Sequence, residues 1–167
     1  MHQGVLRTPI LGHHLAATVP VVGYQPWASS PGARAVMQGN RASNTRPELA
    51  LRRHLHGLGL RYRVDAPLPL EGARRRADVL FPRHRVAVFV DGCLWHSCPD
   101  HCRPPRTNAE YWHAKLARNQ ARDADTNRRL AELGWVVLRI WEHENPLDAA
   151  ERVAALIDAR SDARAPR

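Results

Sequence analysis

Lysine is almost absent from this sequence. Lys115 is the only lysine, so arginine carries nearly all of the positive charge, and the formal net charge over the 167 residues is +9. A GC-rich coding sequence favours arginine and explains part of this bias. Arginine is also the side chain best suited to phosphate, because its planar guanidinium presents a fork of donors. The charge therefore favours a polyanionic partner, but it does not separate a nuclease from a repressor or a ribosomal protein.

The sequence also lacks an apolar run long enough to span a bilayer. Its first residues carry one cation, Arg7, before a weakly apolar stretch that His, Pro and Gly interrupt, so they make a poor signal peptide. We therefore expect a cytoplasmic protein without a membrane anchor. The length suits one domain, which we place at residues 37–160. A disordered or loosely attached extension (1–36) precedes it, and a charged tail (161–167) follows.

Apolar periodicity predicts one mixed α/β domain, with helices packed on a small central sheet. The apolar runs ADVLF (77–81) and VAVFV (86–90) predict a hairpin, and the second run is apolar throughout, as in a strand buried on both faces. The remaining predicted elements are a helix beginning near Thr45 that runs into a strand, a helix over 108–133, a strand over 135–142 and a helix over 146–159.

All three cysteines lie between residues 93 and 102, and an odd number cannot pair completely within the chain. A disulfide framework is therefore not expected. Cys93, Cys98 and His101 form C-x4-C-x2-H, a compact set of ligands that suit zinc. A structural site needs a fourth ligand, and His143, directly after the last predicted strand, would tie the loop to the core. Cys102 is a competing ligand, and a chance Cys/His-rich loop is the plain alternative.

Five residues of the predicted helix 108–133 fall on one stripe at a 3.6-residue period: Trp112, Leu116, Asn119, Asp123 and Leu130. The apolar members indicate that this face points inward, where Asn119 and Asp123 require partners. Asp123 either makes a structural salt bridge or lines a site. We favour the site, because the neighbouring arginines 118 and 122 lie on another face of the helix.

Two acidic residues accompany the predicted hairpin strands. Asp78 lies inside ADVLF, where aspartate is disfavoured unless it caps a strand end, and Asp91 follows VAVFV, with His96 five residues later. Carboxylates at the ends of adjacent strands are what Mg²⁺ requires, and a nearby histidine can take a proton from water near neutral pH. In a basic protein, this combination predicts metal-assisted phosphodiester hydrolysis.

The segments ADVLF, VAVFVDGCLWHSCPDHC, TNAEYWHAKLARNQARD and LGWVVLRIWEHE closely resemble the very short patch repair endonucleases, over about residues 28–159. The resemblance implies a restriction-endonuclease-like fold of the PD-(D/E)xK type: one α/β domain with a central mixed sheet flanked by helices and a structural zinc site. It implies a Mg²⁺-dependent enzyme that nicks one strand 5′ of the mismatched thymine at T·G mismatches left by deamination of 5-methylcytosine. Expected partners are mismatched double-stranded DNA, mismatch-repair proteins and a repair polymerase, for a monomer associated with the bacterial nucleoid.

By the same resemblance, Asp78 and the backbone carbonyl of Val90 bind Mg²⁺, His96 handles the attacking water, and Asp123 supports the hydrogen-bond network. One departure is Asp91, which stands where some members carry histidine. An aspartate there binds metal or hydrogen-bonds inward, and beside the other two carboxylates it concentrates negative charge that only Mg²⁺ could offset. The active-site lysine common in this nuclease superfamily is missing, which gives His96 more weight.

Glu48 also matches a site residue of the family. A bland structural role is equally adequate for it, because Glu48 stands three residues after Thr45, which is the spacing of a helix capping box. Pro47 between them suits the first turn of a helix. Both interpretations of Glu48 stay open at this point.

In members of this family, bulky side chains enter the duplex beside the mismatch, at positions matching Leu94, Trp95 and Trp112. Insertion costs roughly a few kcal/mol of stacking, and a mispair opens more easily, which is a physical route to selectivity. Leu94 replaces an aromatic, which weakens the wedge, and core packing is the alternative for both tryptophans. Asn119 would contact the mismatch or the DNA backbone. The arginines of residues 74–76 would touch phosphates or form a solvated loop.

Two other functions fit parts of the sequence. A zinc-stabilised DNA-binding module without catalysis accounts for the charge and the cysteine cluster, but it leaves Asp78, His96 and Asp123 without a task. A related nuclease with a different target, such as a restriction enzyme, is the other alternative.

Overall fold

The computed structural model describes residues 43–163. A four-stranded mixed sheet forms its centre, with the strands in the order β1-β2-β3-β4. β1 pairs antiparallel with β2, β2 pairs antiparallel with β3, and β3 pairs parallel with β4. The strands are β1 (Arg63–Pro67), β2 (Arg76–Phe81), β3 (Val86–Asp91) and β4 (Val136–Trp141). The predicted hairpin and the strand over 135–142 are therefore confirmed to within one residue at each end.

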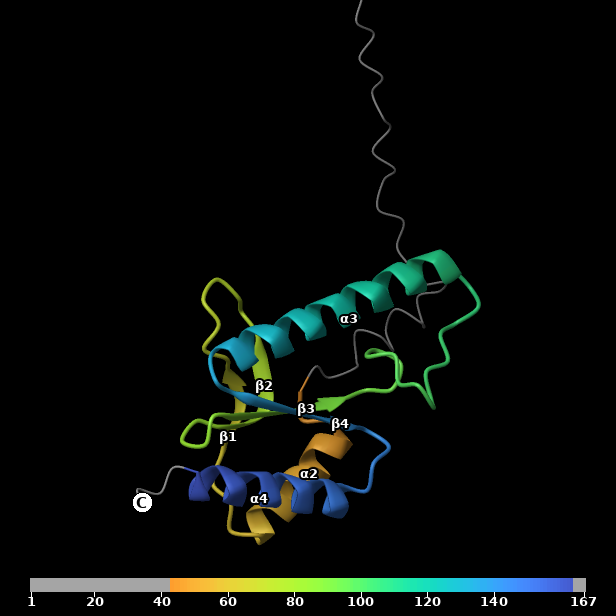
Figure 1. Cartoon of the computed structure of the whole chain (residues 1–167). Helices are drawn as coiled ribbons and strands as arrows, with labels where there is room; N and C mark the ends of the chain where they lie inside the picture. Colours follow the sequence, from red (N-terminus) through yellow and green to blue (C-terminus); the bar gives the residue numbers. More distant parts are fainter. Residues whose placement is uncertain (1–42, 164–167) are drawn as a thin grey trace, which may run out of the picture.

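Three helices cover the sheet, as the apolar periodicity predicted: α2 (Arg46–Gly57), α3 (Ala109–Glu132) and α4 (Pro146–Asp162). Figure 1 shows α3 across one face of the sheet, and α2 and α4 side by side across the other. None of the helices described between residues 43 and 163 is long and apolar enough to cross a membrane. The predicted extension over 1–36 lies outside the described residues. The helix predicted over 146–159 continues to Asp162.

Alternating side chains of the strands give the sheet two buried faces. Toward α2 and α4, a core forms around Val79, Phe81, Val86 and Val88, with Leu51 and Leu55 of α2 and Val153 and Ile157 of α4. Toward α3, a second core contains Ala77, Leu80, Ala87 and Leu130. Each fully buried Val, Leu, Ile or Phe side chain contributes roughly 1.5–3 kcal/mol to folding. The continuous apolar run of β3 is thus explained by burial on both sides.

The alternation is interrupted at Asp78. Ala77 and Leu80, three residues apart, both belong to the core under α3, whereas strict alternation would group Asp78 with Leu80. The paired register of β2 and β3 starts only at Val79 opposite Val88. Beyond that point the Val90 N–H donates to the Asp78 carboxylate at 2.7 Å. The side chain of Asp78 therefore replaces a backbone acceptor where the two strands part, which explains an aspartate inside an apolar strand.

Candidate functional site

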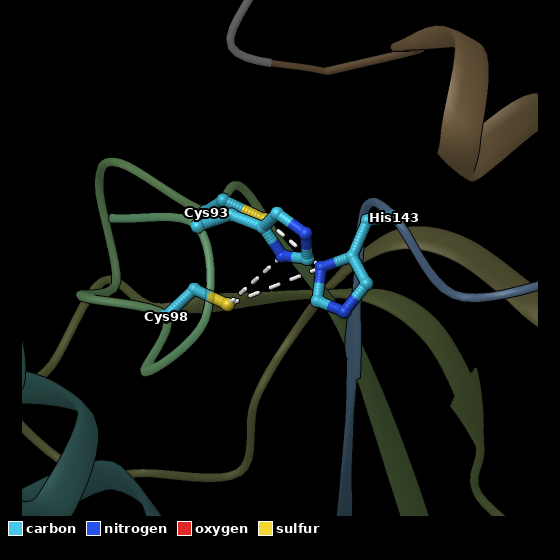
Figure 2. Close-up of side chains that lie close together, drawn as sticks. Cys93, Cys98 and His143 are labelled. Atoms are coloured by element: carbon cyan, nitrogen blue, oxygen red, sulfur yellow. Dashed lines mark hydrogen bonds between the residues drawn. The ribbon is translucent and has the colours of Figure 1, made fainter. Parts of the chain in front are cut away.

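The predicted cysteine and histidine ligands come together at one end of the sheet. Cys93, Cys98 and His101 lie in the loop after β3, and His143 lies in the turn after β4. One candidate ligand atom from each residue lies within 4.8 Å of all the others. Figure 2 shows the thiols of Cys93 and Cys98 and the imidazole of His143 pointing toward one another from these two segments. Cys102 is outside the group, since its thiol contacts the Leu94 carbonyl at 3.8 Å.

The distances in this group suit a tetrahedral ion. Cys93 Sγ is 3.1 Å from His143 Nδ1, and Cys98 Sγ is 3.8 Å from His101 Nδ1 and 3.9 Å from His143 Nδ1. Tetrahedral zinc with usual bond lengths separates a sulfur and a nitrogen ligand by about 3.5 Å. Burial raises the pKa of Cys93 to about 12, and Cys98 and Glu142 add to the effect. A cation is therefore needed to turn the Cys93 thiol into a thiolate ligand.

Glu142, directly after β4, contacts this loop and was not singled out by the sequence. Its Oε1 accepts a hydrogen bond of 2.6 Å from the Cys93 N–H, so the end of β4 holds the start of the loop. Gly92, beside it, leaves room for Trp95, because a Cβ at position 92 would lie 3.2 Å from Trp95 Cδ1. The only sequence signal for this role was that Glu142 precedes the predicted ligand His143.

His96, in the same loop, is paired with Asp123 of α3. His96 Nδ1 lies 2.5 Å from Asp123 Oδ2, and the His96 side chain is partly exposed. Burial alone would raise the pKa of Asp123, but the contacts with His96, Arg139 and Arg122 hold it below its usual value. Asp123 is thus ionised and can accept the Nδ1 proton, which leaves Nε2 of His96 with its lone pair. This is the arrangement of a histidine oriented to accept a proton.

Asp78 lies in the same neighbourhood. Burial raises its pKa from 3.8 to about 6, and the negative charges of Glu48 and Asp91 add to this, outweighing the Val90 N–H and the charge of Arg52. Within the described part of the chain, no basic side chain lies within 4.0 Å of its carboxylate. Asp91, whose charge Asp78 senses, has its Oδ1 3.6 Å from His96 Nδ1. Asp91 therefore links Asp78 to the His96–Asp123 pair, since its charge acts on Asp78 and its Oδ1 lies near the His96 ring.

The surroundings of Asp91 differ from the sequence-based prediction of how its charge is offset. Both of its oxygens contact Arg139 Nη1 of β4, at 2.8 and 2.7 Å, and its side chain is almost fully buried. The expectation that only Mg²⁺ could offset the charge near Asp91 was therefore wrong, because a guanidinium already does. Of the two roles left open, Asp91 adopts the inward hydrogen bonds. Arg139 was missed, although it is the one charged residue inside the apolar strand VVLRIW.

Arg139 also bears on whether Asp123 makes a structural salt bridge or lines a site. Its Nη2 lies 3.2 Å from Asp123 Oδ1, while the other oxygen of that carboxylate faces His96. Asp123 thus makes a salt bridge and lines the site at once. Arg122, which was expected on a different face of α3, is 3.8 Å from Asp123 Oδ1. The prediction considered only arginines of the same helix, whereas the main partner comes from β4.

Glu48 is buried at the start of α2, and both oxygens of its carboxylate have polar partners. It accepts hydrogen bonds from the Thr45 hydroxyl (2.8 Å) and the Asn44 N–H (2.9 Å), and it pairs with Arg52 at 2.7 Å. The predicted capping box does not form, because the Thr45 side chain donates to Glu48 and caps no backbone N–H, and Glu48 accepts the N–H of Asn44 in place of that of Thr45. Glu48 anchors the helix start, and its charge also reaches Asp78.

The aromatic residues form a cluster between the loop and α3. The rings of Trp95 and Trp112 are 5.7 Å apart, and the Lys115 ammonium lies 4.7 Å from the Trp95 ring centre. Trp112 is buried, so core packing accounts for it in this structure, whereas Leu94 and Trp95 are partly exposed. Asn119 Nδ2 donates to the Trp95 carbonyl at 2.9 Å and thereby holds the loop.

Two of the three arginines at 74–76 have protein partners. Arg75 contacts Thr126 Oγ1 at 2.7 Å and Asp125 Oδ2 at 2.8 Å, which docks this loop on α3. Arg76 pairs with Asp65 of β1 at 2.7 Å. Arg74 is exposed. A phosphate contact stays a prediction for Arg74, while Arg75 has a structural role that the sequence did not indicate.

The raised pKa of Asp78 has a measurable consequence for stability. Because the folded protein binds this proton more tightly, the contribution of Asp78 to stability falls as the pH rises from about 4 to about 6 and then stays level. We expect Asp78→Asn to unfold at a higher temperature than wild type above pH 6 in the absence of divalent ions. The gain is about 1–3 kcal/mol and disappears near pH 4. Thermal denaturation across this range measures it, and a loss of stability at pH 7.5 would contradict the assignment.

The His96–Asp123 pair, the buried Asp78 carboxylate and the large positive charge of the chain suit a phosphodiester hydrolase that acts on nucleic acid. Known proteins agree: the family model described as DNA mismatch endonuclease Vsr matches residues 30–103. The Type II nicking enzyme V.NaeI of Lentzea aerocolonigenes is 50% identical over 137 residues, which cover 81% of each chain. The Type II nicking enzyme V.NmeDIP of Neisseria meningitidis serogroup C is 39% identical over 122 residues, covering 70% of this chain and 80% of the relative.

The DNA mismatch endonuclease Vsr of Escherichia coli K12 is a further relative, 38% identical over 110 residues that cover 64% of this chain and 66% of the relative. The chain therefore belongs to the Vsr family of DNA mismatch endonucleases, and it is a DNA endonuclease. The sequence-based resemblance to this family is confirmed. The mixed sheet flanked by helices is compatible with the nuclease fold that the resemblance implied.

Proposed function

We propose that the protein nicks one strand of double-stranded DNA on the 5′ side of the mismatched thymine at T·G mismatches, with Mg²⁺ as catalytic and Zn²⁺ as structural ion. The observation that carries the proposal is the His96–Asp123 pair, together with the Asp78 carboxylate that Asp91 links to it. The relatives support the target, since they are named as mismatch endonuclease and as nicking enzymes. A module that only binds DNA would have no use for this pair.

In the proposed reaction, His96 Nε2 accepts a proton from the water that attacks the phosphorus. The new P–O bond forms as one bridging P–O bond of the phosphodiester breaks, and the departing sugar oxygen takes a proton from solvent water. Asp123 holds the opposite ring nitrogen, so the ring keeps its orientation while it gains positive charge. Asp78 would hold Mg²⁺, which would neutralise charge on the scissile phosphate. The Val90 carbonyl stays the proposed second ligand. Its N–H already bonds Asp78, which fixes the carboxylate against this segment.

Selectivity for a mismatch is assigned to the loop that carries Leu94 and Trp95. Both side chains are partly exposed, and Trp112 with Lys115 supports the Trp95 ring from α3. Insertion of such a wedge opens a stacked step, which costs less at a mispair. Because Trp112 is buried, its proposed role is to support the Trp95 ring and not to enter the duplex itself. The resulting nick would be processed by a repair polymerase and mismatch-repair proteins in the bacterial nucleoid, with the endonuclease acting as a monomer.

The zinc site is proposed to fix the loop that presents His96. Cys93, Cys98, His101 and His143 join this loop to the end of β4, so loss of the ion would free His96 from its place. We expect wild type to hold one zinc ion per chain, Cys98→Ala to lose it, and Cys102→Ser, a matched control four residues away, to keep it. Metal content of the purified proteins measures this. Equal loss in the Cys102 variant would contradict the ligand assignment.

The proposed target is tested with a set of end-labelled duplexes that differ at one base pair and carry each mismatch in turn. With Mg²⁺, we expect a single nick in the thymine strand of the T·G duplex, 5′ of the thymine, and far slower cleavage of paired DNA. Equal cleavage of paired DNA would instead indicate a nuclease with another target. Tight binding without any nick would indicate a binding module.

A further inference from the structure

Arg139 joins two acidic residues beside the proposed general base. Its Nη1 contacts both oxygens of Asp91, and its Nη2 lies 3.2 Å from Asp123 Oδ1. We propose that Arg139 is a positioning residue of the nuclease site, which assigns Asp123 and not Asp91 as the partner of His96. The inference rests on the proposed function, since it concerns the same histidine.

His96 has two carboxylates within reach. Its Nδ1 is 2.5 Å from Asp123 Oδ2 and 3.6 Å from Asp91 Oδ1. Arg139 occupies both oxygens of Asp91 but only one oxygen of Asp123, so the free oxygen of Asp123 is the one that faces the ring. Without the guanidinium, Asp91 would be a buried carboxylate lacking a cation, and the nearest polar hydrogen would be that of His96. The imidazole would then be drawn away from its place against α3.

Two further contacts hold the guanidinium. Its carbon lies 4.8 Å from the ring centre of Phe89, which is its register partner in β3. Its Nε lies 3.3 Å from Asn127 Oδ1, one turn along α3 from Asp123. These contacts fix the plane of the fork, so the directions of its N–H groups are fixed as well. A lysine would supply one point charge and could not hold both carboxylates in this geometry.

The test compares single-turnover nicking of a T·G duplex, DNA affinity and thermal unfolding. Arg139→Gln alone would leave the Asp91 carboxylate buried without a cation, which can unfold the protein. The main comparison is therefore between Asp91→Asn and the double variant Asp91→Asn/Arg139→Gln, in which both side chains are neutral. We expect the double variant to nick roughly 10- to 100-fold more slowly than Asp91→Asn, because Asp123 loses the Arg139 contact that fixes its second oxygen and, through it, the place of His96; small misplacements of catalytic groups have effects of this size. DNA affinity and unfolding temperature should match those of Asp91→Asn.

Two further variants complete the experiment. Arg139→Lys keeps the charge and should also nick more slowly than wild type. Arg128→Gln, at an exposed arginine that pairs with Asp125 and Glu132, should leave nicking unchanged. Equal rates for Asp91→Asn and the double variant, a slower rate explained by weaker DNA binding, or a wild-type rate for Arg139→Lys would each overturn the inference. If wild type itself nicks no duplex, the proposed function fails instead.

Discussion

Asp78→Asn is expected to slow single-turnover nicking of a T·G duplex by roughly 1,000-fold or more, because a carboxylate that holds the catalytic ion contributes several kcal/mol. The substitution keeps the shape of the side chain and an oxygen that can accept the Val90 N–H. It removes only the charge. DNA affinity measured without divalent ions should therefore stay at the wild-type value or rise slightly, since a negative charge is lost.

Asp65→Asn is the matched control for this experiment. Asp65 lies on β1, is about half exposed and pairs with Arg76, away from the His96–Asp123 pair. Its nicking rate should equal that of wild type. If Asp78→Asn nicked within a few-fold of wild type while remaining folded, Asp78 would have no role in holding the ion. The assay uses enzyme in excess over labelled duplex, so that product release does not mask the chemical step.

His96→Ala is expected to lower the same rate constant by roughly 100- to 10,000-fold, the range found when a general base is removed. The ring contacts Asp123 Oδ2 and is partly exposed, so its removal leaves no large buried cavity. Added imidazole should recover part of the lost activity, because a free base can occupy the space beside Asp123. Nicking rates at increasing imidazole concentration measure this recovery.

The matched control for His96 is His56→Ala, at an exposed position in the last turn of α2. It should nick at the wild-type rate, with and without imidazole. A His96→Ala protein that nicks as fast as wild type would show that another group accepts the proton. Loss of DNA binding in the same variant would mean that the histidine contacts DNA and does no proton transfer.

Most of the architecture follows from local apolar patterns. The runs ADVLF and VAVFV, a 3.6-residue stripe in α3 and the strand before His143 each specify one element, and burial of one or two faces fixes how these elements stack. The four residues of the candidate zinc cluster were also predictable, because three lie in one loop and the fourth directly follows a strand. The structure brings these four together and leaves Cys102 outside.

The acidic part of the site could not be derived in the same way. Arg139 reaches Asp91 only because β3 and β4 pair in parallel, with Phe89 opposite Arg139 and Asp91 opposite Trp141. A sequence gives no register between strands that are 45 residues apart, so the compensating charge was missed and Mg²⁺ was given that role. Glu142 was missed for a similar reason, since its acceptor role depends on a backbone N–H in a distant loop.

A crystal structure of the protein with a T·G duplex and Ca²⁺, which prefers the same oxygen ligands as Mg²⁺, decides whether Asp78 and His96 act on one phosphate. We expect the ion at about 2.3–2.6 Å from the Asp78 carboxylate and from an oxygen of the phosphate 5′ of the mismatched thymine. His96 Nε2 should face that phosphate, with Nδ1 still on Asp123. An ion bound away from Asp78, or a duplex whose thymine-side phosphate lies against another surface, would contradict this account.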